Sequence, residues 1–202
     1  MCVCVSMDQV ALAPPANNYP ETEAALKSRL AISLVDVSTK LNFWDFCDGP
    51  WYVVARYYSA FGIPAIATDI TFEFDREDGA NANVMDFRMR YLLKHGREQK
   101  EMSVKARMVN ERQMTVHVPI PLYPMSVGCT IWGLWQQSRS DGGKPKYYAA
   151  VIGTDSKDMV YLLRKGSPDI PDPTFYDEMC EVARRSGYKQ ELLRQCKHTQ
   201  QH

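Results

Sequence analysis

The sequence predicts an all-β protein, an eight-stranded antiparallel up-and-down barrel with one C-terminal α-helix and an N-terminal extension. From residue 49 onward, apolar residues recur with a period near two for about a hundred residues, which is the spacing of half-buried strands. Turn-forming segments such as Asp141-Gly142-Gly143 and Gly153-Thr154-Asp155 separate the strands. Eight such strands leave two open edges unless the sheet closes into a barrel, whose interior has room for one small ligand.

Length and charge restrict the class of protein. The 202 residues fit one domain with an extension. The 24 basic residues balance the 24 acidic residues, so nucleic acid is not expected as a partner. No apolar run reaches the roughly 20 residues of a membrane-spanning helix. The composition is therefore that of an ordinary globular chain without a transmembrane helix.

We expect residues 1–40 to form the N-terminal extension and residues 41–202 to form the barrel domain. Residues 1–16 are mildly apolar and end near Ala11-Leu12-Ala13, which is similar to a signal-peptidase site, although Asp8 interrupts the apolar stretch. This segment favours secretion over a cytoplasmic location and leaves the compartment open. Residues 14–24 form a linker rich in Pro, Asn and acidic residues, and the apolar spacing of residues 24–39 predicts one helix.

The eight predicted strands share alternating apolar and polar residues or a richness in β-branched and aromatic residues. They are residues 51–58, 70–75, 83–92, 100–109, 113–120, 130–137, 147–152 and 159–164. After them, residues 172–186 predict the helix, because Asp172 can cap it, Pro173 suits its first turn and Gly187 can end it. Residues 191–196 are expected to form a last strand or a tail along the barrel.

Strand alternation also predicts which side chains line the barrel interior. They are Phe72, Phe74, Phe87, Met89, Tyr91, Met102, Val104, Met108, Met114, Val116 and Trp135, with Tyr147 as a further candidate. Methionine supplies four of the eleven, and its flexible thioether adapts to irregular apolar ligands. A bulge would invert the assignments that follow it along a strand. Long side chains of this kind can also fill a barrel completely, so a solid interior stays open as an alternative.

The cysteines do not predict a metal site or a cofactor. The spacing Cys2-x-Cys4 is too short for tetrahedral zinc ligation, and the other four cysteines are dispersed at Cys47, Cys129, Cys180 and Cys196. Free or buried thiols with one or two stabilising bridges fit this pattern, and the sequence does not choose the connectivity. We therefore expect neither a metal nor a cofactor.

The segment Gly49-Pro50-Trp51-Tyr52 resembles the Gly-x-Trp-Tyr signature that opens the first strand of lipocalins. The strand at residues 147–152 and the run of residues 161–168 into a single helix extend the likeness over about residues 41–200. This order of elements resembles apolipoprotein D and the bacterial outer-membrane lipocalins more closely than the odorant-binding branch. The family's arginine on the last strand has Lys165 in its register here, with Arg164 one position earlier. The loop between the sixth and seventh strands lacks the family's Thr-Asp-Tyr.

The resemblance implies a barrel closed at one end by Trp51 with a cation across its ring, from Arg164 or Lys165. It also implies that the C-terminal tail is pinned to the barrel, with Cys196 bridging to Cys47 or Cys129. At the other end, up-and-down topology places the mouth at residues 59–65, 93–99, 119–128 and 153–158. Pro119, Pro121 and Pro124 should make the third of these a lid-like loop. Its apolar rim suits lipid capture or docking to a membrane or protein, or the loops simply pack on each other.

The predicted function is to bind and carry a small hydrophobic ligand, such as a lipid, fatty acid, retinoid or pigment-like molecule, inside the barrel. One alternative is a lipocalin-type enzyme acting on a lipid or epoxide, for which Cys129 at the mouth is the candidate thiol. Another is a protein-interaction module with an empty barrel. No catalytic residue is assigned, and the oligomeric state stays open.

Overall fold

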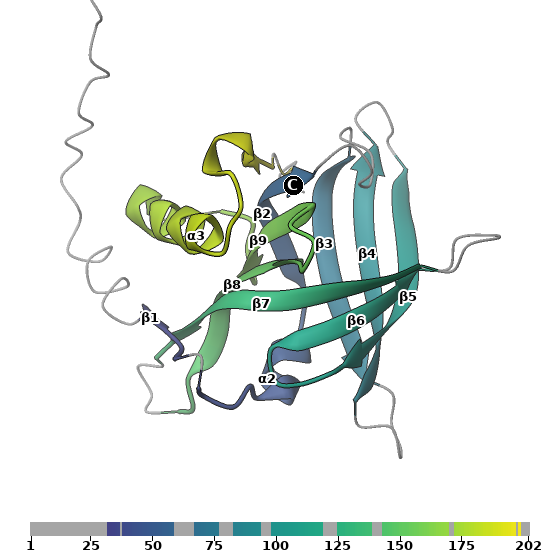
Figure 1. The fold of residues 1–202 in the computed structure, drawn as a ribbon, viewed down its shortest axis with the longest axis horizontal. Helices are drawn as coiled ribbons and strands as arrows, with labels where there is room; N and C mark the ends of the chain where they lie inside the picture. The colour runs from purple at the N-terminus through teal and green to yellow at the C-terminus, as the bar shows by residue number, and fades with distance from the viewer. Residues whose placement is uncertain are drawn as a thin grey trace, which may run out of the picture.

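The computed structural model describes residues 32–36, 38–58, 67–76, 83–93, 98–118, 125–138, 143–169, 172–196 and 198. Their β-strands form one antiparallel sheet that closes into an eight-stranded barrel, as the sequence predicts (Figure 1). The barrel strands are β2 (Trp51–Tyr58), β3 (Ala67–Arg76), β4 (Val84–Leu93), β5 (Gln99–Met108), β6 (Gln113–Val118), β7 (Met125–Gln137), β8 (Lys146–Thr154) and β9 (Met159–Lys165). The short helix α2 (Phe43–Cys47) precedes β2 and lies at one end of the barrel.

Each barrel strand pairs with the next along the chain, and the pairing of β2 with β9 closes the ring. This closing ladder runs from Trp51 opposite Lys165 to Tyr58 opposite Met159. Strand β7 starts at Met125, so residues 125–128, which the sequence places in a mouth loop, belong to the wall instead. They pair with β6, and this pairing satisfies the backbone groups on that edge of the strand.

The strand β1 (Ile32–Leu34) corrects the prediction of one helix over residues 24–39. It pairs with the end of β7, from Ile32 opposite Gln137 to Leu34 opposite Trp135. Strand β6 pairs with residues 125–130 of β7, and β1 pairs with the same edge of β7 beyond the last of them. An uncovered strand edge offers backbone hydrogen bonds that outweigh the weak local preference for helix. Residues 24–31 lie outside the described residues.

The helix α3 (Pro173–Arg185) forms where the sequence predicts it and packs on the outside of the barrel (Figure 1). The Asp172 side chain accepts a hydrogen bond from the Thr174 amide at 2.9 Å, and Gly187 takes a φ of +93° just after the helix. Phe175, Met179, Cys180 and Ala183 are buried against outward-facing side chains of the strands β2, β7, β8 and β9. This contact forms a second apolar core. Beyond α3, a 3₁₀ turn (Gln190–Leu192) leads to β10 (Arg194–Gln195), which pairs with β2.

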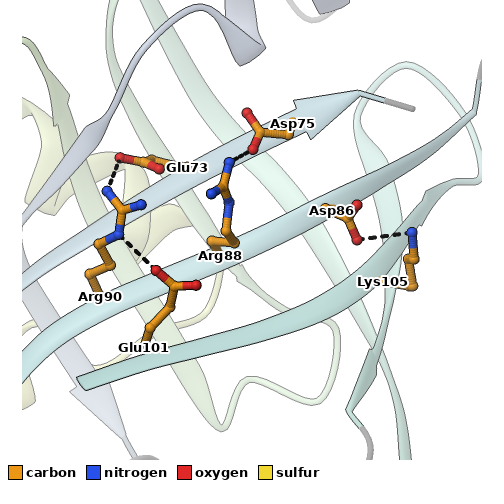
Figure 2. Close-up of polar contacts among 7 residues, drawn as sticks. All are labelled: Glu73, Asp75, Asp86, Arg88, Arg90, Glu101 and Lys105. Atoms are coloured by element: carbon orange, nitrogen blue, oxygen red, sulfur yellow. Dashed lines mark hydrogen bonds and ion pairs between the residues drawn. The ribbon is translucent and has the colours of Figure 1, made fainter. Parts of the chain in front are cut away.

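On β3, β4 and β5 the outer face of the barrel carries ion pairs instead of apolar contacts (Figure 2). Arg90 bridges Glu73 at 2.7 Å and Glu101 at 2.9 Å. Arg88 pairs with Asp75, and Lys105 lies 3.0 Å from Asp86. Because these pairs are partly exposed, each is worth only about 0.2–1 kcal/mol. They show that the strands alternate between a charged outer face and an apolar inner face.

Candidate functional site

The barrel interior is the candidate site. Ten of the eleven side chains that strand alternation predicts for the interior are found there. Phe72, Phe74, Met89, Val104, Met114 and Val116 are buried in the interior cluster, and Phe87, Tyr91, Met102 and Met108 are partly buried and packed against it. The three phenylalanines form one aromatic group. The Phe72 and Phe87 rings meet edge to face at 5.0 Å, and the Phe74 and Phe87 rings stack at 5.1 Å.

Trp135 is the exception, because it lies on the outer face of the barrel. Its indole Nε1 donates a hydrogen bond to Glu178 of α3 at 2.9 Å, and its ring meets Phe175 edge to face at 5.6 Å. The register of β7 against β8 shifts between Ile131 and Gly133 and again at Trp135. The extra residue inverts the alternation, so Leu134 faces the interior instead.

Gly133 is the sequence signal that could have identified this bulge. A Cβ atom at Gly133 would lie 2.8 Å from Val182 of α3 and 2.9 Å from the Trp135 ring. A glycine inside a strand often marks a bulge or the close approach of another segment, and here both occur. The interior also holds side chains that the sequence reasoning did not select: Val53, Ile70, Met85, Ala106, Ile131, Leu134, Ala150, Ile152, Tyr161 and Leu163.

Trp51 closes one end of the barrel. Its ring is fully buried, its Nε1 donates to the Phe46 carbonyl of α2 at 2.8 Å, and the two rings lie 5.0 Å apart. Lys165 provides the cation, with Nζ 5.3 Å from the indole centroid, and it also donates to the Asp45 carbonyl. Burial lowers the pKa of Lys165 below its ordinary value.

Arg164 and Gly49, the other two residues of the family resemblance, lie outside the contact between Trp51 and Lys165. The Arg164 guanidinium lies over the ring of Tyr148 at 4.9 Å, and Tyr148 belongs to the outer core beside α3. Gly49 takes a φ of +82°, which a residue with a side chain rarely adopts, in the turn that leads from α2 to β2. Of the two predicted cations, Lys165 therefore faces Trp51 and Arg164 faces the helix side.

Cys129 lies on the inner face, packed against the interior cluster. Burial raises the pKa of this thiol to about 12, and the nearby Asp155 carboxylate acts in the same direction. A reactive cysteine needs the opposite shift. His117 lies on the exposed face of β6, where its Nδ1 is 2.9 Å from the Ser126 hydroxyl, so it does not share the inner face with Cys129. This arrangement does not favour nucleophilic catalysis at Cys129.

In the described part of the chain, Cys47, Cys129, Cys180 and Cys196 are all free thiols. The C-terminal tail is therefore held to β2 by hydrogen bonds and not by a bridge from Cys196. No group of His, Cys, Asp or Glu suited to a metal ion occurs among the residues that the structure describes. Within the same residues, no helix is long and apolar enough to cross a membrane.

The buried thiols and phenols predict a loss of stability in alkaline solution. Burial raises the pKa of seven such groups: Cys129, Cys180, Cys196, Tyr147, Tyr148, Tyr176 and Tyr188. The folded chain keeps these protons to higher pH than the unfolded chain, so the free energy of unfolding falls as pH rises above the unfolded thiol value of about 9. Among the described residues, the lowered pKa values of the lysines Lys157 and Lys165 act in the opposite direction over this pH range, but the seven thiols and phenols outnumber these two lysines.

We expect the urea midpoint, measured under reducing conditions, to be steady near pH 8 and to fall progressively toward about pH 11. A midpoint that stays level or rises over this range would contradict the burial of these groups.

The predicted mouth lies at the end of the barrel opposite Trp51 and α2. Residues 59–66, 94–97 and 119–124, which include the proline-rich loop, lie outside the described residues. Of the connections predicted for the mouth, the structure describes the turn between β8 and β9 in full. In this turn Asp155 accepts a hydrogen bond from the Thr130 hydroxyl at 2.6 Å. The apolar rim therefore stays a prediction.

No protein-family model and no curated protein sequence matches the chain. Solved structures do match it. Lobster apocrustacyanin A1 has a TM-score of 0.55 at 8% identity, covering 78% of this chain and 80% of that one. Insecticyanin from the tobacco hornworm Manduca sexta has a TM-score of 0.53 at 8% identity, covering 80% and 83%. The cockroach allergen Per a 4 has a TM-score of 0.55 at 9% identity, covering 82% and 94%. At these identities the likeness is one of fold.

Proposed function

The chain has the lipocalin fold, and from that premise we propose that it binds and carries a small hydrophobic ligand inside the barrel. The observation that carries the proposal is a closed barrel in which every strand contributes apolar side chains to the inner wall, while the outer face of β3, β4 and β5 is charged. Burying apolar surface is the main source of affinity for such a ligand, at ~25 cal/mol per Å².

Several inward-facing side chains keep exposed surface, which supports space for a ligand. Phe87, Tyr91, Met102 and Met159 pack against the interior cluster yet are only partly buried. Near the closed end, Phe46, Trp51 and Met85 are fully buried. Met89 and Ile70, farther from the closed end, are fully buried as well, so the support for accessible space comes from the four partly buried side chains.

The lining favours a long and flexible or polyene ligand, such as a lipid, fatty acid, retinoid or pigment-like molecule. The four predicted methionines, Met89, Met102, Met108 and Met114, all belong to the inner wall or pack against it. Their thioethers adapt to an irregular apolar surface, and the aromatic group around Phe87 offers faces for a conjugated chain. We expect a dissociation constant on the order of 1 μM or below.

Native mass spectrometry of the full chain, purified from its natural source, tests the proposal. We expect a mass above that of the polypeptide by one small organic molecule, which organic extraction removes. The stripped protein should then bind retinol, a neutral fluorescent polyene, in a saturable manner with one site per chain. A chain that carries nothing and shows no saturable retinol binding after extraction would overturn the carrier function in favour of an interaction module with a filled barrel.

Two further parts of the proposal concern where the protein works. Secretion and contact of the mouth loops with a membrane stay predictions, because residues 1–31 and the loops at residues 59–66 and 119–124 lie outside the described residues. Neither is needed for ligand binding by the barrel.

A further inference from the structure

The ladder between β2 and β3 is the weakest part of the barrel wall. On one edge, β2 pairs with β9 along its whole length. On the other edge it pairs with β3 at only two positions, Trp51 opposite Phe72 and Tyr52 opposite Thr71. Beyond these positions β3 departs from regular pairing. Its register with β4 shifts between Thr68 and Thr71, and Asp69 takes a φ of +50°.

The C-terminal segment, here residues 194–196 together with His198, takes the place of β3 along the rest of this edge. Gln195 pairs with Ala55, the Cys196 amide donates to the Val54 carbonyl at 2.9 Å, and His198 Nε2 donates to the Val53 carbonyl at 2.8 Å. His198 also faces β3, with Nδ1 4.0 Å from the Asp69 carboxylate. Figure 1 shows the chain returning from α3 to β2 to reach this position.

This segment is part of the inner wall and not only an outer strap. The Cys196 side chain packs against the interior cluster. Arg56, which is 9% exposed and lies opposite the inward-facing Tyr161, donates to the Ala67 carbonyl and so links β2 to β3 at the same level. Among the described residues, withdrawal of the segment would leave the wall between β2 and β3 beyond Tyr52 spanned by the Arg56 side chain instead of by a paired strand.

Among the described residues, two registered pairs and two further hydrogen bonds hold the segment to β2. Strand β10 has two residues. A strand this short opens with a smaller free energy than the global unfolding of a domain, because few backbone hydrogen bonds hold it. The rest of the wall has longer ladders, such as the nine registered pairs between β4 and β5.

We propose that residues 194–196 together with His198 form a lateral gate between β2 and β3, through which the apolar ligand enters and leaves the barrel. The proposal rests on the carrier function above and adds the route of exchange. A gate changes the barrier and not the end states, so opening or locking it changes the association and dissociation rates by the same factor and leaves the dissociation constant unchanged.

Stopped-flow fluorescence with retinol and the full chain tests the gate. The locked variant combines Gln195→Cys and Ala55→Cys in a Cys196→Ala background. The two residues lie directly opposite each other in an antiparallel pair, where the Cα atoms are about 4.5–5.5 Å apart, which is within the range of a disulfide. We expect oxidation to slow both rates by at least about tenfold and reductant to restore them. His198→Ala should speed both rates by about fivefold, as the loss of one hydrogen bond allows. The matched control His117→Ala, on the exposed face of β6, should leave them unchanged.

The outcomes separate the gate from the carrier function. Retinol binding with unchanged affinity and unchanged rates in the oxidised locked variant and in His198→Ala would overturn the gate and assign exchange to the mouth. A change in the dissociation rate alone would also overturn it, because the segment would then be a contact for the ligand. The absence of saturable retinol binding to the unaltered chain would overturn the carrier function together with the gate.

Discussion

Replacement of Trp51 by alanine is expected to lower the free energy of unfolding by about 3–5 kcal/mol, the range for deleting a large buried aromatic side chain. The indole is fully buried, its Nε1 satisfies the Phe46 carbonyl at 2.8 Å, and the Lys165 ammonium lies over its ring. The substitution leaves a cavity, an unpaired carbonyl and a half-buried cation at once. Urea unfolding followed by circular dichroism measures the loss.

Trp132→Ala is the matched control for Trp51→Ala. Trp132 is also a tryptophan of the barrel wall, but it is only partly buried on the outside, where it donates to the Tyr188 hydroxyl at 3.2 Å and lies under Lys157. We expect a loss of about 1 kcal/mol there. Equal losses for the two variants, or a loss below about 1 kcal/mol for Trp51→Ala, would show that the closed end does not depend on this residue.

Met102→Glu is expected to weaken retinol binding by about 30-fold or more, the effect of an ionised group in an apolar binding site. Met102 packs against the interior cluster and lies opposite Met89 in the ladder between β4 and β5. Its partial exposure lets a glutamate be accommodated without unfolding the barrel. Fluorescence titration with retinol measures the change, and the neutral probe avoids repulsion between ligand and carboxylate.

Ser103→Glu is the matched control for Met102→Glu, because the two residues are neighbours on β5 and face opposite sides of the wall. Ser103 is exposed and lies opposite Arg88 on the charged outer face. The same added charge there should leave retinol affinity within about twofold. If both substitutions weaken binding equally, or neither does, then the ligand does not occupy the interior.

The sequence predicts the strands and the barrel well because one physical constraint acts on nearly every residue of the wall. A residue such as Phe74 faces the interior while Asp75 faces solvent, so the period of two is visible without any partner strand. The helix α3 is equally visible, because Asp172 and Gly187 mark its ends.

The parts that the sequence did not predict depend on partners distant in the chain. Trp135 faces outward because a bulge in β7 accommodates α3, which packs over Gly133. The local sequence of β7 does not predict how close α3 comes to the strand. Strand β1 forms because β6 leaves an edge of β7 unpaired. The pairing of β10 with β2 follows from the break in β3 near Asp69. In each case a tertiary contact determines the conformation of a segment whose own preference for a secondary structure is weak.

The ring closure between β2 and β9 has a consequence for how the chain folds. It joins Trp51 to Lys165, which are separated by about a hundred intervening residues, whereas every other barrel ladder joins neighbours in sequence. Loop-closure entropy opposes such a contact until the strands between are in place. Hairpins between neighbouring strands can therefore form early, and the ladder between β2 and β9 forms last. We expect this step on the millisecond-to-second timescale of topologies rich in non-local pairing.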